Sequence, residues 1–498
     1  MKRIELKKLI PGLSVIIMCV SLTACGQNTS VSTTATDTVI ETSISSEEET
    51  ESEMPEGEAP EKPDGEAPGE PPSEDRPEGA PGGEFGGGFG GGGMSSADID
   101  YTGSVEITSS ETQSGKTYTS TTSDESALLI ATGDEVTISD ATVSKTGDSD
   151  GGDNCNFYGL NATVLVKDGS VTTITGATIT SDADGANGVF SYGGNGGQNG
   201  AEGDGTTVII SDSVITTTGN GSGGIMTTGG GITEASNLTV ETSGQSSAAI
   251  RTDRGGGTVT VDGGTYTTNG LGSPTIYSTA DITVSNAVLV SNLSEAVCIE
   301  GKNSITLTDC DMTAENTETN GNATFLDSIM IYQSMSGDAD SGTSSFNMTG
   351  GNLTSKSGHV FHVTNTNAVI NLSGVKITNL DSDNILLSVC DDGWSGADNI
   401  ATINASGQVL EGKILVGSNS TLTLKLTDGS EYTGSISGEI TNAKGKTVST
   451  EVGEVHVTID ASSTWTLTED TYITSFDGDI SSIISNGYTL YVNGVAVN

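Results

Sequence analysis

Residues 258–270 read Thr-Val-Thr-Val-Asp-Gly-Gly-Thr-Tyr-Thr-Thr-Asn-Gly. Apolar and polar side chains alternate at first, a tight polar corner follows, and a second short run ends in an Asn-Gly turn. Because side chains on a strand point alternately to opposite faces, this pattern predicts two short β-strands rather than a helix. The same motif, called the repeated phrase below, recurs at residues 136–143, 174–179, 282–288, 305–312 and 370–377.

The corners of this phrase are regularly spaced. Asp212, Ser236, Asp262, Asn286 and Asp309 follow one another at steps of 24, 26, 24 and 23 residues. A regular period in this range predicts a solenoid, in which each coil buries its apolar side chains only by stacking on its neighbours. Longer steps elsewhere in the chain fit coils that carry an inserted loop.

The strand pattern and the period together predict the fold class. We expect an all-β, single-stranded, right-handed parallel β-helix over residues 98–400, in which Val259, Ile282 and Ile305 stack into an inward ladder. From residue 401 the period loosens. Residues 401–498 are therefore predicted to form the last β coils and a cap.

Residues 1–24 have the composition of an export signal. Basic residues precede an apolar run that is too short to span a bilayer. The run ends in Leu22-Thr23-Ala24-Cys25-Gly26, which is similar to the lipobox of bacterial lipoproteins. The resemblance implies lipid transfer to the Cys25 thiol, cleavage before Cys25 and anchoring to the outer face of the cytoplasmic membrane. An ordinary secretory signal with a chance cysteine is the alternative.

Residues 25–97 are predicted to be a disordered linker. Ser, Thr and Glu dominate the first part, Pro, Glu and Gly dominate the second, and residues 86–93 are almost entirely glycine. Such a segment has too little apolar surface to offset the entropy of an ordered chain. Fully extended, it would reach on the order of 200 Å and project the folded domain to the cell surface.

The charge balance is strongly acidic. The chain has 66 Asp and Glu against 18 Lys and Arg, for a formal net charge of −48 at pH 7. This balance argues against nucleic acid as a partner, and it leaves the N-terminal lipid as the contact with the membrane. It is compatible with divalent cations, with neutral glycans, or with acidic glycans bridged by a cation. Solubility outside the cell is the simpler explanation.

Several loops are rich in aspartate, and Ca²⁺ is the candidate ion for them. Calcium takes six to eight oxygen ligands, which alternate carboxylates on one loop can supply. None of these loops completes an EF-hand or a tandem nonapeptide calcium repeat, and turn formation alone favours Asp at corners. The candidate ligands are Asp148, Asp150, Asp153, Asp182, Asp184, Asp338, Asp340, Asp381 and Asp383.

Candidate glycan-binding residues are two arginines and two aromatic residues. Arg251 and Arg254 flank Asp253 and are the two arginines that follow the linker. Paired guanidinium groups can clamp a uronate or a sulfate, and in a lyase an arginine can act as the base. The alternative is a structural ion pair with Asp253. Trp394 and Tyr192 are predicted to lie in loops, where an aromatic ring can stack on a sugar.

Histidine and cysteine give weaker signals. His359 and His362 are three residues apart and would face opposite sides of a strand, which disfavours a joint zinc site. With three histidines and no other marker, no Ser-His-Asp arrangement can be argued. Cys298 and Cys310 are half a coil apart, so they either face one another across the core or are small inward-stacked residues.

The chain resembles a group of secreted and lipid-anchored β-helix surface proteins of clostridial, gut-type bacteria. The similarity is carried by the Gly/Pro/Glu linker and by four segments of the domain, residues 116–121, 248–257, 294–301 and 331–338. The resemblance strengthens the fold prediction. A looser resemblance connects the chain to β-helix proteins that bind plant-wall polysaccharides and to pectate lyases, although the catalytic pattern of the lyases has no match here.

Three hypotheses for the function follow. The first is a non-catalytic cell-surface lipoprotein for adhesion or for binding extracellular polysaccharide, host surface or cell wall. The second is a polysaccharide lyase or hydrolase for acidic plant-type or host glycans, with Arg251, Arg254 and Asp253 as its catalytic residues. A flat threonine surface that binds an ordered lattice is a third, weaker alternative because the coils are interrupted by loops.

Overall fold

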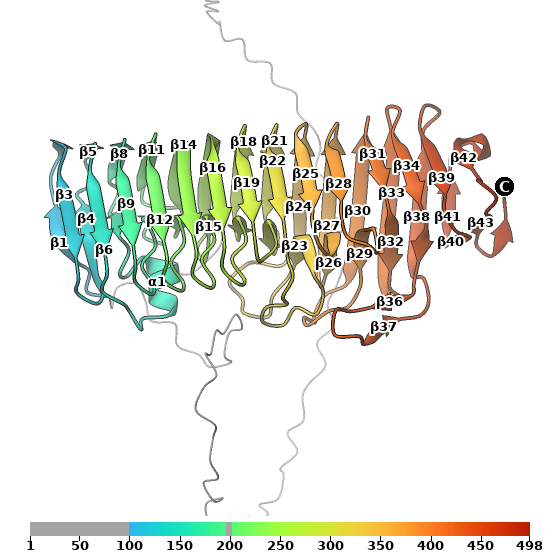
Figure 1. Ribbon diagram of the computed structural model, residues 1–498, viewed down its shortest axis with the longest axis horizontal. Helices are drawn as coiled ribbons and strands as arrows, with labels where there is room; N and C mark the ends of the chain where they lie inside the picture. Colours follow the sequence, from blue (N-terminus) through green and yellow to red (C-terminus); the bar gives the residue numbers. More distant parts are fainter. Residues whose placement is uncertain (1–98, 196–201) are drawn as a thin grey trace, which may run out of the picture. The chain divides into compact units, whose positions relative to one another are not determined.

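The computed structural model describes residues 99–195 and 202–498. The predicted export signal, the lipidation site at Cys25 and the linker at 25–97 lie outside these residues. The described chain winds into a row of stacked coils, each of which adds one layer (Figure 1). Neighbouring coils pair in parallel, so the predicted all-β parallel β-helix is confirmed.

A typical coil consists of three strands. They are β18 (Asp281–Ser285), β19 (Val288–Ser291) and β20 (Val297–Glu300). Each pairs in parallel with its counterpart in the next coil, namely β21 (Ser304–Thr308), β22 (Asp311–Ala314) and β23 (Asp327–Tyr332). Repetition of this unit gives the solenoid three faces.

Faces 1 and 2 meet at the tight corner of the repeated phrase. The strands of face 1 are β2 (Glu111–Ser114), β5 (Glu135–Ser139), β8 (Val171–Thr175), β11 (Thr207–Ser211), the first halves of β14 (Gly231–Thr242) and β16 (Gly257–Thr268), β18, β21, β24 (Thr343–Thr349), β27 (Asn367–Ser373), β30 (Asn399–Ser406), β33 (Ser420–Thr427), β38 (Glu454–Ile459) and β41 (Ser475–Asp477). Those of face 2 are β3 (Thr117–Ser120), β6 (Thr142–Lys145), β9 (Thr178–Ser181), β12 (Val214–Thr217), the second halves of β14 and β16, β19, β22, β25 (Asn352–Ser355), β28 (Lys376–Asn379), β31 (Val409–Glu411), β34 (Glu431–Gly434), β39 (Thr464–Leu467) and β42 (Ile483–Ile484).

Face 3 is a separate 13-stranded parallel sheet. Its strands are β1 (Thr102–Ile107), β4 (Glu125–Ala131), β7 (Val164–Lys167), β10 (Val189–Tyr192), β13 (Ile225–Thr228), β15 (Ile250–Thr252), β17 (Ile276–Ser278), β20, β23, β26 (His359–Thr364), β29 (Ile385–Val389), β32 (Lys413–Val416) and β35 (Ile436–Ser437). The remaining elements are helix α1 (Asp153–Tyr158), the antiparallel pair β36 (Ile440–Thr441) and β37 (Thr447–Ser449), a 3₁₀ turn at Ile480–Ser482, and the end strands β40 (Thr471–Ile473), β43 (Leu490–Val492) and β44 (Val495–Ala496). Parallel pairing on face 1 continues past residue 400, from β30 through β33 and β38 to β41.

From the coil of β2 to the coil of β33, the corner between faces 1 and 2 contains a left-handed residue. Asp212, Asn286 and Asp309 occupy it with φ of 50°, 55° and 51°. Asp, Asn and Gly tolerate this conformation, which explains why they recur there. In the coils of β14 and β16 the left-handed residues are Asn237 and Gly263, so the choice of Ser236 and Asp262 from the sequence was wrong by one residue.

The apolar residues of the repeat stack inside the coils as the alternation predicts. Val259 is in register with Ile282, and Ile282 with Ile305. All three are at most 1% exposed and belong to one continuous core. Each coil therefore buries its apolar side chains against the coils on either side.

Face 3 differs from the other two faces because it is buried on both sides. In β20 and β23 every residue is buried, whereas strands of faces 1 and 2 alternate between buried and exposed. Helix α1 and the loops at 315–326 and 391–398 carry residues that pack over its outer surface, and the loop at 333–342 is hydrogen-bonded to Glu300 and Arg254 there. Figure 1 shows α1 and the β36–β37 pair on the same side of the row of coils. The long insertions in the sequence are thus the segments that cover face 3.

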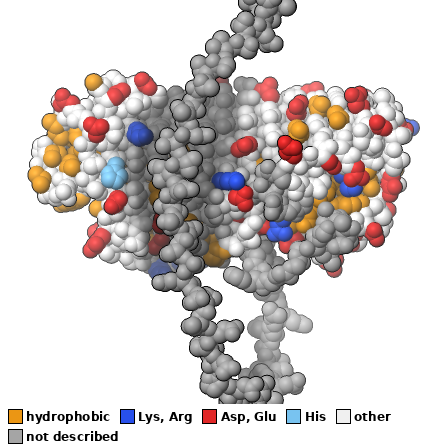
Figure 2. Space-filling view, turned by 180° about the vertical axis from the view of Figure 1, so that it is seen from behind, with side chains coloured by type: hydrophobic (Ala, Val, Ile, Leu, Met, Phe, Trp, Pro, Cys, Tyr) orange, Lys and Arg blue, Asp and Glu red, His pale blue; other side chains and the backbone are white. Residues whose placement is uncertain are grey.

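Acidic side chains are spread over the exposed surface. Figure 2 shows Asp and Glu scattered over one side of the described chain, with Lys and Arg less frequent. The Lys302 and Asp340 side chains form one of the surface ion pairs, at 2.9 Å. Such exposed pairs contribute little to stability.

We predict that Ile282→Ala lowers the free energy of unfolding by about 2–5 kcal/mol, because it leaves a cavity in the inward ladder. Thr283→Ala, next to it but exposed, should change the stability by less than about 0.5 kcal/mol. The measurement is denaturant unfolding followed by circular dichroism. Equal losses in the two variants would contradict the assignment of inward and outward positions.

Candidate functional site

The outward side of face 3 carries a row of aligned side chains beneath the covering loops. Arg251 is in register with Tyr277, Tyr277 with Cys298, Cys298 with Met330, and Met330 with His362. These are the positions that a β-helix usually presents to solvent. Here insertions cover them, so polar groups in the row must find partners within the protein.

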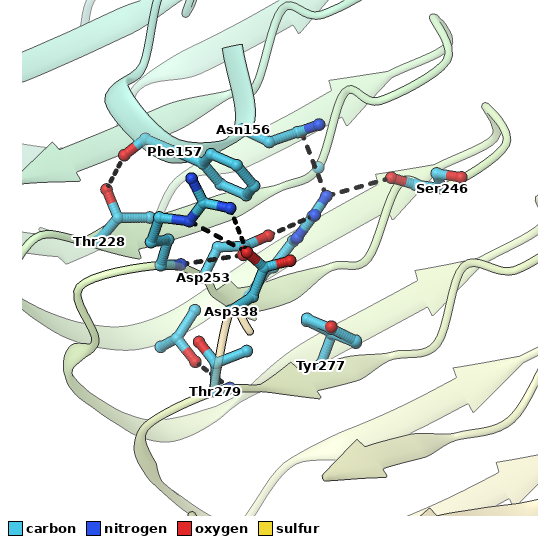
Figure 3. Close-up of polar contacts among 12 residues, drawn as sticks. Asn156, Phe157, Thr228, Ser246, Asp253, Tyr277, Thr279 and Asp338 are labelled. Carbon is cyan, nitrogen blue, oxygen red and sulfur yellow. Dashed lines mark hydrogen bonds and ion pairs between the residues drawn. The ribbon is translucent and has the colours of Figure 1, made fainter. Parts of the chain in front are cut away.

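Arg251 and Asp253 form a buried ion pair. The Arg251 guanidinium Nη2 donates to Asp253 Oδ2 at 2.5 Å, and the two side chains are 7% and 3% exposed. Arg251 Nη1 also donates to Asn156 of helix α1 at 3.3 Å and to the Ser246 carbonyl at 3.4 Å (Figure 3). The guanidinium carbon lies 5.4 Å from the centroid of the Tyr277 ring. Arg251 is thus held by contacts on several sides.

Arg254 is held by a different carboxylate. Its Nε and Nη2 donate to Asp338 Oδ1 at 3.0 and 2.5 Å, and its guanidinium carbon lies 4.1 Å from the centroid of the Phe157 ring. Asp253 accepts instead from the Arg254 backbone N–H at 2.9 Å. Figure 3 shows Asp253 and Asp338, the carboxylate partners of the two arginines, close together beneath helix α1. Each predicted glycan-binding arginine therefore has an acidic partner within the chain.

Burial and neighbouring charges shift the pKa of Asp253. Burial raises this pKa from 3.8 to about 6, and the Asp338 carboxylate adds to the rise, while the Arg251 cation and two hydrogen bonds oppose it. The desolvation of the carboxylate thus outweighs its ion pair.

A buried carboxylate network around Glu300 was missed by the sequence reasoning. Glu300 accepts from the Tyr277 hydroxyl at 2.5 Å and the Tyr332 hydroxyl at 3.2 Å, and Ser334 also donates to it. Burial raises the pKa of Glu300, although these hydrogen bonds oppose the shift. The only signal in the sequence is a glutamate that ends the apolar run Val-Cys-Ile-Glu of residues 297–300.

Two histidines, a serine and an aspartate meet further along face 3. His359 Nδ1 and His362 Nδ1 each lie 2.7 Å from Ser388 Oγ, and His362 Nε2 lies 3.4 Å from Asp392 Oδ2. The expectation that the two rings face opposite sides of the strand was wrong, since both contact Ser388. Burial lowers the pKa of His359 to about 3, assisted by His362.

This Ser-His-Asp arrangement was also missed by the sequence reasoning, and it is enclosed. His362 and Ser388 are 0% exposed, and the Asp392 side chain is 0% exposed. The Phe325 ring stacks on His362 with centroids 4.7 Å apart. Asp392 accepts from the Thr324 backbone N–H at 2.9 Å and from its hydroxyl at 2.5 Å. The cluster thus ties the loop at 315–326 to the strands below it.

The candidate calcium ligands are distributed over several coils. Asp148 accepts from the Asp184 N–H at 2.9 Å, Asp182 from the Thr218 hydroxyl at 2.6 Å, Asp184 from the Asn220 N–H at 2.7 Å, and Asp381 from the N–H groups of Gly358 and Asp383 at 2.8 and 2.9 Å. Asp338 and Asp340 pair with Arg254 and Lys302, while Asp150 and Asp153 are exposed. Within residues 99–195 and 202–498, no group of three or more His, Cys, Asp or Glu is arranged to hold a metal ion. Calcium binding stays a prediction.

The two predicted aromatic contacts lie in different environments. Tyr192 is 2% exposed at the end of β10 and packs edge-on against Tyr158 at 5.9 Å between centroids. Its placement in an exposed loop was therefore wrong. Trp394 does lie in a loop, is half-buried, and packs on Tyr332 at 4.9 Å between centroids.

The two cysteines do not face one another across the core. Cys310 lies in the core inside the coils, as one of the two alternatives predicted. Cys298 points outward from face 3 and packs with Tyr277 and Met330, so its inward placement was wrong. All four cysteines of the described residues are buried free thiols.

A surface groove lies between the loop that follows β23 and the loop that precedes β30. Its volume is about 370 Å³. It is lined by Gln333, Ser341, Gly342, Thr343, Asn365, Thr366, Asn367, Ala397, Asp398 and Ile400. The lining is rich in amides and hydroxyls, contains one carboxylate and has no lysine or arginine. Sequence reasoning missed this groove because its walls come from three different coils.

The floor of the groove is rigidly built, whereas its rim is exposed. Asn365 Nδ2 donates to the Gln333 carbonyl at 2.7 Å, and its Oδ1 accepts from the Ala397 N–H at 2.6 Å. Asn367 and Asp398 are exposed at the rim. The Asn365 side chain thus connects the two loops and fixes the width of the groove.

Comparison with models of known protein families, with curated proteins and with solved structures gave no match. Among the described residues, no helix is both long and apolar enough to cross a membrane. The interpretation of the site therefore rests on its geometry.

We predict that the Asp253 carboxyl makes a contribution to the free energy of unfolding, and that this contribution increases as the pH falls from about 6 to about 4. In this range the folded carboxyl, with its raised pKa, binds a proton that the unfolded carboxyl does not. Asp253→Asn mimics the protonated form, so its free energy of unfolding should lack this pH-dependent contribution. Denaturant midpoints measured across this pH range compare the two proteins, and Asp134→Asn, at an exposed position, serves as the control. Identical pH slopes in the wild type and Asp253→Asn would contradict the prediction.

Proposed function

We propose that this protein is a non-catalytic, lipid-anchored surface protein whose β-helix binds polysaccharide or serves in adhesion. The observation that carries the proposal is the groove between the loops at 333–343 and 397–400. Amide and hydroxyl side chains can both donate hydrogen bonds to sugar hydroxyls and accept them, and about 300–1,000 Å³ is the usual size of a small-molecule site. At about 370 Å³, the groove lies within this range.

The charge of the groove favours neutral sugars over uronates. Asp398 is its one ionisable lining residue, and no cation lines it to offset the charge of an acidic glycan. Trp394, on the same loop as Asp398, is half-buried and can offer a ring edge or face beside the groove. The proposal includes a second way of binding, in which a Ca²⁺ ion bridges the acidic surface of the protein to an acidic glycan.

The ion pairs of the two arginines support the non-catalytic form of the proposal. A lyase base must reach the substrate, whereas Arg251 is 6% exposed and bonded to Asp253, and Arg254 is bonded to Asp338. The second candidate, a lyase or hydrolase of acidic glycans, would require these pairs to open. Anchoring through Cys25 and projection on the linker complete the proposal and are inferred from the sequence.

We predict that the full-length protein is retained on a neutral polysaccharide and that Asn367→Ala and Asp398→Ala each weaken retention. The loss of one or two hydrogen bonds to sugar hydroxyls should cost about 1–2 kcal/mol, or roughly tenfold in affinity. Affinity electrophoresis in gels of xylan, glucomannan and polygalacturonate, with calcium or with chelator, measures this. Asn352→Ala is the matched control because Asn352 is exposed on face 2, away from the groove. Equal retention of all variants would reject the groove as the site.

We also predict no release of unsaturated sugar ends from polygalacturonate. The test follows the ultraviolet absorbance that β-elimination produces, with wild type and Arg254→Ala in parallel. Absorbance that rises with the wild type and is abolished in Arg254→Ala would overturn the non-catalytic assignment and establish a lyase.

A further inference from the structure

A fully buried lysine lies near the first coils of the helix. Lys145 ends β6 and is 0% exposed. In the neighbouring coils its position on face 2 is held by small hydroxyl residues, Ser120 on one side and Ser181 and Thr217 on the other. A lysine therefore replaces a serine or threonine at an enclosed corner, and neither the fold nor the proposed glycan binding requires it.

An asparagine carboxamide shares a hydrogen-bond acceptor with this lysine. Lys145 Nζ donates to the Gly147 carbonyl at 2.5 Å and to the Thr122 carbonyl at 2.7 Å. Asn161 Nδ2 donates to the same Gly147 carbonyl at 2.9 Å and to the Asp184 carbonyl at 3.1 Å. The two side-chain nitrogens thus lie within two hydrogen-bond lengths of each other.

The carboxamide is buried and incompletely satisfied. Asn161 is 1% exposed, and its Oδ1 is enclosed without a hydrogen-bond partner among the described residues. Its Nδ2 already donates to two carbonyls, which fixes the orientation of the amide. An unsatisfied buried acceptor is costly, so its presence beside a buried amine calls for an explanation.

The surroundings favour a reactive amine. Burial lowers the pKa of Lys145, while the carboxylates of Glu125, Asp124 and Asp148 act in the opposite direction. A desolvated lysine that loses its proton is a nucleophile. The charges of Glu125 and Asp124 act on this amine, so these carboxylates are the candidates to accept its proton.

We propose that Lys145 and Asn161 form an intramolecular isopeptide bond. The Lys145 ammonium first gives a proton to the carboxylate of Glu125 or Asp124. The neutral Nζ then attacks Cγ of Asn161, and the Nζ–Cγ bond forms. The Cγ–Nδ2 bond breaks, and Nδ2 leaves as ammonia with a proton from Nζ, relayed by the carboxyl group. One amide replaces another, so no oxidant or other co-reactant is needed.

The bond would close the insertion that carries helix α1. Residues 146–163 connect face 2 to face 3, and the helix within them supplies the contacts of Asn156 and Phe157 with the two arginines. A covalent link across a loop of this length restricts the unfolded chain much as a disulfide does. Unlike a disulfide, it would resist reducing conditions.

The test is peptide mapping of the full-length protein after denaturation. Trypsin cleaves after free lysine, so an unlinked chain gives the separate peptides 117–145 and 146–167. The linked chain should instead give one product spanning 117–167, uncut after Lys145 and lighter than the sum of its residues by one ammonia. Fragmentation should place the link between Lys145 and Asn161.

Two variants serve as controls, and one side reaction can be distinguished by its peptides. Lys145→Arg and Asn161→Ala should both give peptide 146–167 without loss of ammonia. Separate wild-type peptides at full mass would overturn the proposal, and this result needs no variant to fold. Loss of ammonia with normal cleavage after Lys145 would indicate a cyclic imide at the asparagine and would overturn it equally.

Discussion

The structure depends on the stacking of equivalent residues of successive coils, which lie one strand spacing apart in parallel β-sheets. Each coil satisfies its backbone groups by hydrogen bonding to the coils on either side, and each inward side chain has its counterpart from the next coil as its main neighbour. This constraint shapes the corner between faces 1 and 2, where a left-handed Asp, Asn or Gly recurs from the coil of β2 to the coil of β33. In the coil of β38 and β39 the corner is longer and carries no left-handed residue, yet the pairing continues into β41 and β42.

The polar chemistry of the molecule arises where this constraint is relaxed. Insertions enter the coils at the two corners that flank face 3, and they fold back over its outer surface. They bring arginine, glutamate and histidine side chains out of water, so these groups must pair with one another. The ion pairs of Arg251 and Arg254, the Glu300 network and the Ser388 cluster are products of this covering layer, and the open groove lies at its edge.

The sequence predicted what is local and periodic. The alternation identified the inward ladder of Val259, Ile282 and Ile305, because strand periodicity and coil spacing need no information from outside the repeat. The ion pair of Arg251 with Asp253 could be weighed as an alternative because the two residues are only two apart, at the end of β15. The contact of Arg254 with Asp338, 84 residues away, and the burial of Tyr192 depend on how insertions fold over face 3, which no periodic pattern encodes.

Because the long insertions lie at the corners beside face 3, the loops of this architecture can vary independently of its strands. From β2 to β31 the link between faces 1 and 2 is at most two residues long, as at Asn286 and Asp309, while the segment between β22 and β23 spans residues 315–326. A lineage could therefore lengthen, shorten or exchange such a segment and acquire a new binding surface without disturbing any strand pairing. The tight corner sets the length of the coil, and the loops beside face 3 can change without altering it.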